Sequence, residues 1–149
     1  MKRLSPILIL LLLLAPFLAG CNQTGKRGDH AYRLAPLSQM PHEVRQAPAS
    51  VREAYQFAVH NEDLLRRLPC TCGCAALGHT SNYACYVAGV DERGLPLYDN
   101  HAIDCRICVD ITQDAMRLLD DGHTVAQIYA HVDATYGQFG PATPLGHLP

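Results

Sequence analysis

Three cysteines stand at every second position in Cys70-Thr71-Cys72-Gly73-Cys74. Two more cysteines follow close together, at Cys105 and Cys108. A thiolate is the soft ligand that favours Cu(I), Zn(II) or an iron–sulfur cluster, and core packing alone does not explain so many thiols in a small domain. The pattern predicts a domain organised around a thiolate metal site.

A disulfide framework is the structural alternative. The six cysteines that follow Cys21 are Cys70, Cys72, Cys74, Cys85, Cys105 and Cys108, and an even count in an exported chain is typical of disulfides. Cysteines two positions apart rarely close an unstrained bridge with each other. Each thiol of the 70–74 stretch would therefore need a partner among the other three cysteines, and the same convergence would build a metal site.

The spacing bears on which metal binds. Cys105-Arg106-Ile107-Cys108 has the C-x₂-C spacing of zinc-binding pairs, which makes Zn(II), in a structural interaction domain, an alternative. Six thiolates exceed the four ligands of one tetrahedral ion, and closely spaced thiolates can bridge ions, so we expect Cu(I), in a polynuclear cluster. His79 and His101 flank the thiol segments as further candidates. The expected metal ligands are Cys70, Cys72, Cys74, Cys85, Cys105, Cys108, His79 and His101.

An enzyme that uses Cys105 and Cys108 is the remaining rival. We expect both residues in the first turn of a helix, where free N–H groups and the helix dipole favour thiolates. A thiol–disulfide oxidoreductase would use such a pair, but its C-x-x-C normally follows a strand in a βαβ unit, which this sequence does not suggest. No Ser/His/Asp set, phosphate-binding glycine loop or paired carboxylates stand out. We therefore expect a protein that is not an enzyme.

The N-terminal residues predict export and lipid anchoring. Lys2 and Arg3 precede the apolar run 7–14, which is too short to span a bilayer. Leu18-Ala19-Gly20-Cys21 resembles a bacterial lipobox, in which the cysteine thiol receives a diacylglycerol and cleavage falls before it. Two acyl chains anchor a protein stably. We expect Cys21 to be lipidated and the protein to lie on the extracytoplasmic face of the cell membrane, or in a periplasm.

Composition divides the rest of the chain. We expect a signal peptide over 1–20, a flexible tether rich in Gly and Pro over 21–49, one metal-binding domain over 50–137, and a disordered tail over 138–149. The formal net charge is −2, and no basic patch is interleaved with aromatic residues. We therefore expect no nucleic-acid partner.

The expected fold class is mainly α: a small helical domain with a cysteine-rich loop and a short β-hairpin. A capping box at Ser50–Glu53 predicts the first helix, with a break near 60–62 and an end before Pro69. The hairpin is expected from strands within 83–90 and 95–98.

Two further helices follow the hairpin in the expected order. Asp104 is expected to cap a helix that runs to Leu119, with Gly122 after its end. A second capping box at Thr124–Gln127 is expected to open a helix that runs to Tyr136.

Several separated segments together resemble the bacterial PCYCGC-motif lipoproteins. They are Leu68–Cys74, Gly78–Asn82, Cys85 and His101–Ile111, in that order, together with the lipobox. Thr71 stands where the family has tyrosine, and Ile103 where relatives are expected to carry methionine. The resemblance implies metal binding, with copper as the candidate metal and no established reaction. A cuproenzyme or a copper transporter would then be the protein partner.

Overall fold

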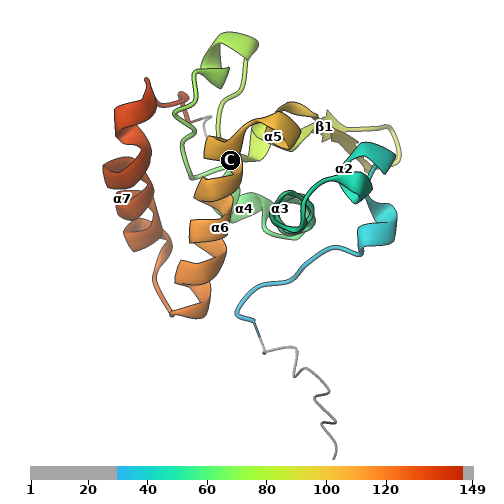
Figure 1. The fold of residues 1–149 in the computed structure, drawn as a ribbon, viewed down its shortest axis with the longest axis horizontal. Coiled ribbons are helices and arrows are strands. Elements are labelled where there is room, and N and C mark those ends of the chain that lie inside the picture. The colour runs from blue at the N-terminus through green and yellow to red at the C-terminus, as the bar shows by residue number, and fades with distance from the viewer. Residues whose placement is uncertain (1–29, 146–149) are drawn as a thin grey trace, which may run out of the picture.

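Three helices form the framework of the fold, α3 (Ala49–His60), α6 (Arg106–Asp120) and α7 (Val125–Tyr136). The computed structural model describes residues 30–145, and in it α6 packs against both α3 and α7 (Figure 1). Shorter helices are α2 (His42–Gln46), α4 (Glu62–Leu65) and α5 (His101–Asp104), with 3₁₀ turns η2 (Leu37–Gln39), η3 (Cys74–Leu77), η4 (Tyr83–Cys85) and η5 (Gly137–Phe139). The expected mainly α fold with a small hairpin is confirmed.

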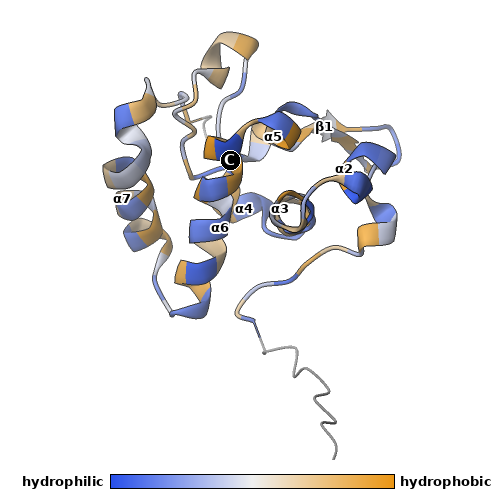
Figure 2. Cartoon of the chain, in the orientation of Figure 1, coloured by the Kyte–Doolittle hydropathy of each residue, from blue (hydrophilic) through white to orange (hydrophobic). Residues whose placement is uncertain are grey.

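The core lies on both sides of α6, against α3 and against α7. Tyr55 and Phe57 of α3, Ile111 of α6, and Ile128 and Val132 of α7 are all fully buried. Hydrophobic and hydrophilic residues alternate along α6 and α7 (Figure 2), as expected of helices that have one apolar face. None of the described helices is long and apolar enough to cross a membrane.

The hairpin consists of β1 (Val87–Val90) and β2 (Pro96–Tyr98), which pair antiparallel. Asp91 closes its turn, since its Oδ1 accepts hydrogen bonds from the backbone N–H groups of Arg93 and Leu95, at 2.8 and 2.9 Å. The first strand is shorter than expected, because residues 83–85 form η4 instead.

Two helix starts differ from the sequence expectation. The helix α3 begins at Ala49 behind Pro48, so Ser50 is inside the helix and forms no capping box. The N-cap of α6 is Cys105, because Asp104 ends the preceding turn α5. The capping box of Thr124 is confirmed, with both reciprocal hydrogen bonds present.

The segment before α3 is folded where a tether was expected. Within residues 30–49, α2 forms, and Met40 and Val44 are buried at 2% and 0% exposure. The backbone N–H of Ala35 donates to the carbonyl of Gln56, at 2.9 Å. Isolated apolar anchors therefore hold a segment that has no helical or strand period. Residues 1–29, which include Cys21 and the signal peptide expected over 1–20, lie outside the described residues.

The segment after α7 also differs from the disordered tail that was expected. After η5, the chain continues over the cysteine-rich loop, where Thr143 is 3% exposed. Thr143 Oγ1 accepts from the backbone N–H of Cys70 at 3.0 Å, and the Thr143 N–H donates to the Cys70 carbonyl at 2.8 Å. This pair of hydrogen bonds, which we call the Thr143 clasp, holds the segment after η5 against the cysteine-rich loop.

Candidate metal centre

Glycine gives the cysteine-rich loop its shape. Gly73 and Gly78 have φ values of +88° and +89° and flank the η3 turn on both sides. Positive φ is readily available only to glycine, so Gly73 lets the chain reverse between Cys72 and Cys74. Both thiols, together with that of Cys70, then lie within 4.8 Å of one another.

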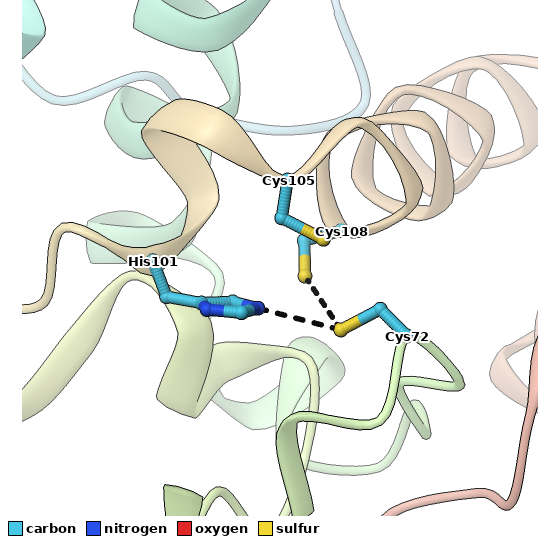
Figure 3. A group of neighbouring side chains, drawn as sticks. All are labelled: Cys72, His101, Cys105 and Cys108. Carbon is cyan, nitrogen blue, oxygen red and sulfur yellow. Dashed lines mark hydrogen bonds between the residues drawn. The ribbon is translucent and has the colours of Figure 1, made fainter.

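The other half of the centre comes from the junction of α5 and α6. Cys105 has an extended backbone, with φ −107° and ψ 97°, and separates the two helices. This bend directs His101, Cys105 and Cys108 toward the loop that carries Cys72 (Figure 3). Cys108 lies in the first turn of α6, as expected, whereas Cys105 is its N-cap.

Cys72 joins the two halves. Its Sγ lies 3.3 Å from His101 Nε2 and 3.6 Å from Cys108 Sγ, the two contacts drawn in Figure 3. With Cys105 these residues form a group of four donor atoms that are all within 4.8 Å of one another. Cys72, His101 and Cys105 are half-buried, while Cys108 is fully buried.

A second group of four donors lies deeper in the protein. It consists of Cys74, His79, Cys85 and, again, His101, with Cys74 Sγ 3.6 Å from Cys85 Sγ. Cys74, Cys85 and His79 are buried, at 1%, 0% and 9% exposure. The η4 turn supplies Cys85, while η3 and the residues after it supply Cys74 and His79.

Cys70 lies between these two groups. Its Sγ is 3.3 Å from Cys108 Sγ and 3.4 Å from Cys72 Sγ. It also lies within 4.8 Å of the sulfur atoms of Cys74 and Cys85. The fold thus brings together all eight residues that the sequence marked as candidate ligands. Among the described residues, the six cysteines form no disulfide.

The donor set fits a soft metal ion. Metal–sulfur bonds of about 2.3 Å separate two thiolates of a tetrahedral site by about 3.8 Å, close to the observed 3.3–3.6 Å. His79 Nδ1 is buried without a hydrogen-bond partner in the described part of the chain. A buried polar atom of this kind costs free energy unless it finds a partner, and a metal ion would supply one. The cysteine and histidine groups could therefore hold a metal ion.

Neighbouring thiols alter one another's acidity. Hydrogen bonds from Cys108 and then from Cys85 hold the pKa of Cys70 well below its ordinary value. A hydrogen bond from Cys85 lowers the pKa of Cys74 to about 7. Hydrogen bonds to Cys108, Cys70 and Cys74, together with burial, raise the pKa of Cys85 itself. Some thiolates thus form readily while others keep their protons, and a bound cation would favour ionisation of them all.

One carboxylate contacts both histidines. Asp99 Oδ2 lies 3.4 Å from His79 Nε2, while Asp99 Oδ1 accepts from the backbone N–H of His101 at 2.7 Å. The Tyr55 hydroxyl in turn donates to the Asp99 carbonyl at 2.7 Å. Asp99 is not among the residues predicted from the sequence, although an Asp two residues before the start of a helix is a known turn signal.

A buried network fixes the Cys108 end of α6. The Tyr86 hydroxyl and Asn82 Nδ2 donate to the Cys108 carbonyl, at 2.8 and 3.2 Å. The Thr112 hydroxyl donates to Asn82 Oδ1 at 2.8 Å and lies 2.7 Å from the Tyr86 hydroxyl. Below the loop, the Thr71 hydroxyl donates to the Tyr136 carbonyl at 2.7 Å. These polar residues hold the backbone of the ligands, and no sequence pattern indicated them.

The comparison with protein families agrees with the motif that organises the site. The model of the family described as "Protein of unknown function with PCYCGC motif" matches residues 10–146. The chain belongs to this PCYCGC family. The resemblance inferred from the cysteine segments is thereby confirmed, and the match also covers most of the segments on either side of the loop. No curated protein and no solved structure matches the chain.

Proposed function

We propose that this PCYCGC protein is a membrane-anchored, extracytoplasmic, non-enzymatic metal-binding protein that holds Cu(I) for storage, detoxification or delivery. The observation that carries the proposal is the convergence of six thiols and two imidazoles from separate elements on one centre. Keeping so many donor atoms buried, reduced and close together would cost free energy, and a bound metal ion would offset that cost. A cuproenzyme or a copper transporter is the partner that delivery would require.

Sulfur chemistry favours copper among the metals that thiolates bind. Six of the eight candidate donors are thiols, and thiolates are the ligands that select Cu(I). Four thiolates and imidazoles would already satisfy one zinc ion, so a single structural zinc leaves half of the donors unexplained. Zn(II) is the alternative that the experiment must separate from Cu(I).

Membrane attachment is supported by the sequence alone. Leu18-Ala19-Gly20-Cys21 resembles a lipobox and follows a short apolar run. Cys21→Ala should move the protein from the membrane fraction to the soluble fraction. Membrane retention with an unchanged mature mass would argue against lipidation.

The metal proposal is tested by titrating the reduced protein with Cu(I), without oxygen, against a competing chelator. Cys72→Ser and Cys108→Ser should each lower the Cu(I) affinity or the number of ions bound, because both residues lie at the meeting point of loop and helix. Cys21→Ser is the matched control and should leave Cu(I) binding unchanged. If one Zn(II) binds per chain and Cu(I) binds no more tightly than to a simple dithiol, the proposal that the protein holds copper is wrong.

A thiol–disulfide oxidoreductase is a second candidate, because Cys105 is half-buried at the start of α6 while Cys108 is buried one turn later. An exposed attacking thiol followed by a buried resolving thiol is the arrangement that such enzymes use. In that case Cys105→Ser should abolish disulfide-reductase activity, whereas Cys74→Ser should retain it. Absence of reductase activity in the reduced wild-type protein would remove this candidate.

A further inference from the structure

We infer that the centre holds two metal ions in two unequal subsites, a buried one that is retained and a half-exposed one that exchanges. This inference rests on the proposed metal-binding function and deepens it. The inner subsite consists of Cys74, Cys85 and His79, and the outer subsite of Cys72, Cys105, Cys108 and His101. Cys70 is the fourth donor of the inner subsite and contacts the outer one.

The grouping of the donor atoms supports two subsites. One four-coordinate ion uses four donors, and the centre offers eight. Among the described residues, Cys105 shares a group of donor atoms within 4.8 Å of one another only with Cys72, His101 and Cys108. No such group contains Cys105 together with Cys74 or Cys85. A single ion therefore cannot bind both ends of the centre at once.

Cys70 lies between the two subsites. Its Sγ contacts Cys72 and Cys108 of the outer subsite at 3.4 and 3.3 Å. It also lies within 4.8 Å of Cys74 and of Cys85 in the inner subsite. His101 belongs to both groups of four donors, and in the division that we infer it binds the outer ion. Cys70 would then be the fourth donor of the inner subsite, and its contacts with Cys72 and Cys108 link the two subsites.

Burial makes the two subsites unequal. Cys70, Cys74, Cys85 and His79 are at most 9% exposed, so a competing ligand has little access to an ion held there. In the outer subsite Cys72, His101 and Cys105 are all half-buried. The accessible donors are therefore those that join the loop to the α5–α6 junction.

A groove borders the outer subsite at Cys105. It has a volume of about 370 Å³ and is lined by Cys105 together with Ile103, Arg106 and Asp110, and by Val51 from α3. A small thiol can approach Cys105 through this groove. Exchange would then proceed as one incoming thiolate forms a bond to the ion while the bond to Cys105 breaks, and the Cys105 thiolate takes up the proton that the incoming thiol gave up. No electron is transferred.

The experiment uses Cd(II) as a soft, spectroscopically visible probe with the anaerobically reduced full chain. Native mass spectrometry should show two Cd(II) ions per chain, and ¹¹³Cd NMR should show two resonances. After addition of excess chelator, one resonance should disappear at least tenfold faster than the other. A single ion, a single resonance, or release of both ions in one phase would overturn the inference.

Two variants assign the subsites. Cys105→Ser should remove the fast-exchanging ion and keep the slow one, whereas His79→Gln should remove the slow one and keep the fast one. Cys21→Ser should keep both. Loss of both ions in each variant would mean one indivisible cluster. Because the wild-type measurements already decide the number and the exchange of the ions, a variant that misfolds does not leave the inference untested.

The outcomes also separate this inference from the proposed function. If Cu(I) binds tightly but only one Cd(II) ion and one resonance are found, the centre does not contain two subsites, and the proposal of copper binding stands. If two Cd(II) subsites are found but Cu(I) binds no more tightly than to a simple dithiol, the inference of two subsites stands and the proposal of copper binding is wrong.

Discussion

Asp99 Oδ2 lies 3.4 Å from Nε2 of His79, whose Nδ1 is buried without a partner in the described part of the chain. A carboxylate beside one ring nitrogen keeps the proton there and leaves a lone pair on the other. We infer that Asp99 favours the tautomer in which His79 Nδ1 is free to bind a metal.

We predict that Asp99→Asn weakens metal binding about 10- to 100-fold, the usual effect of losing such a partner. The asparagine oxygen can still accept from the His101 N–H, so the melting temperature of the metal-free protein should change little. The amide can donate to His79 Nε2 and would then favour a proton on Nδ1. Competition with a chelator measures the affinity, and the exposed Glu92→Gln is the control. Equal affinity in both variants would show that Asp99 has no such role.

Gly140 should not tolerate a side chain. A Cβ at this position would lie 2.8 Å from the Thr71 carbonyl oxygen, which is too close for any real contact. Gly140→Ala should therefore destabilise the protein by about 1–3 kcal/mol, the usual cost of overpacking, and lower its melting temperature. Gly137→Ala is the matched control, because a Cβ there comes no closer than 4.0 Å to a neighbour. Equal melting temperatures for the two variants would contradict the close approach.

The Thr143 clasp should contribute measurably to stability. Thr143→Val keeps the shape of the side chain but removes the acceptor for the buried N–H of Cys70. Leaving such a group unpaired costs about 1–3 kcal/mol, which urea unfolding can measure. Thr135→Val, on the exposed side of α7, should change the free energy of unfolding by no more than about 0.5 kcal/mol. Hydrogen exchange at the Cys70 amide should accelerate only in Thr143→Val, and unchanged exchange there would refute the clasp.

Asp114, at the contact between α6 and α7, should make the free energy of unfolding depend on pH in the acid range. Burial would raise the pKa of Asp114, but hydrogen bonds from His131, Arg117 and Tyr136 outweigh it and hold this pKa below its ordinary value. The stabilisation is then fully present above the unfolded pKa of about 3.9 and is lost as pH falls through the folded pKa.

Asp114→Asn should remove this part of the acid dependence, while Asp133→Asn, exposed on α7, should keep it. Thermal melts between about pH 5 and pH 2 compare the two variants with the wild-type protein. The same acid dependence in Asp114→Asn as in the wild type would be inconsistent with this assignment.

The sequence allowed the framework and the donor set to be predicted, because both follow from local patterns. The apolar period of α6 and the reciprocal capping box at Thr124 predict their helices directly. The alternating cysteines of the 70–74 stretch made convergence with Cys105 and Cys108 the simplest explanation of their number. The structure brings these thiols together in overlapping groups, in which Cys72 lies within reach of both Cys105 and Cys108.

The segments on either side of the domain could not be predicted, because single long-range contacts hold them. Val44 is fully buried in a segment that has no regular apolar period, so its packing depends on the surface that α3 presents. Thr143 likewise occurs in a proline-rich stretch, and only the position of Cys70 in space makes its hydroxyl a partner. The start of α6 was also predicted wrongly: Asp104 was expected at the N-cap, and Cys105 occupies that position.

The Thr143 clasp also sets the order in which the protein can mature. Thr143 lies 73 residues after Cys70 in the chain, and a ribosome adds residues from the N-terminus onward. During synthesis the thiols of the 70–74 stretch emerge long before the residue that fastens their backbone. An ion captured early would meet a loop that is not yet fastened, and the clasped form of the centre exists only after residue 143 has been made and has folded back.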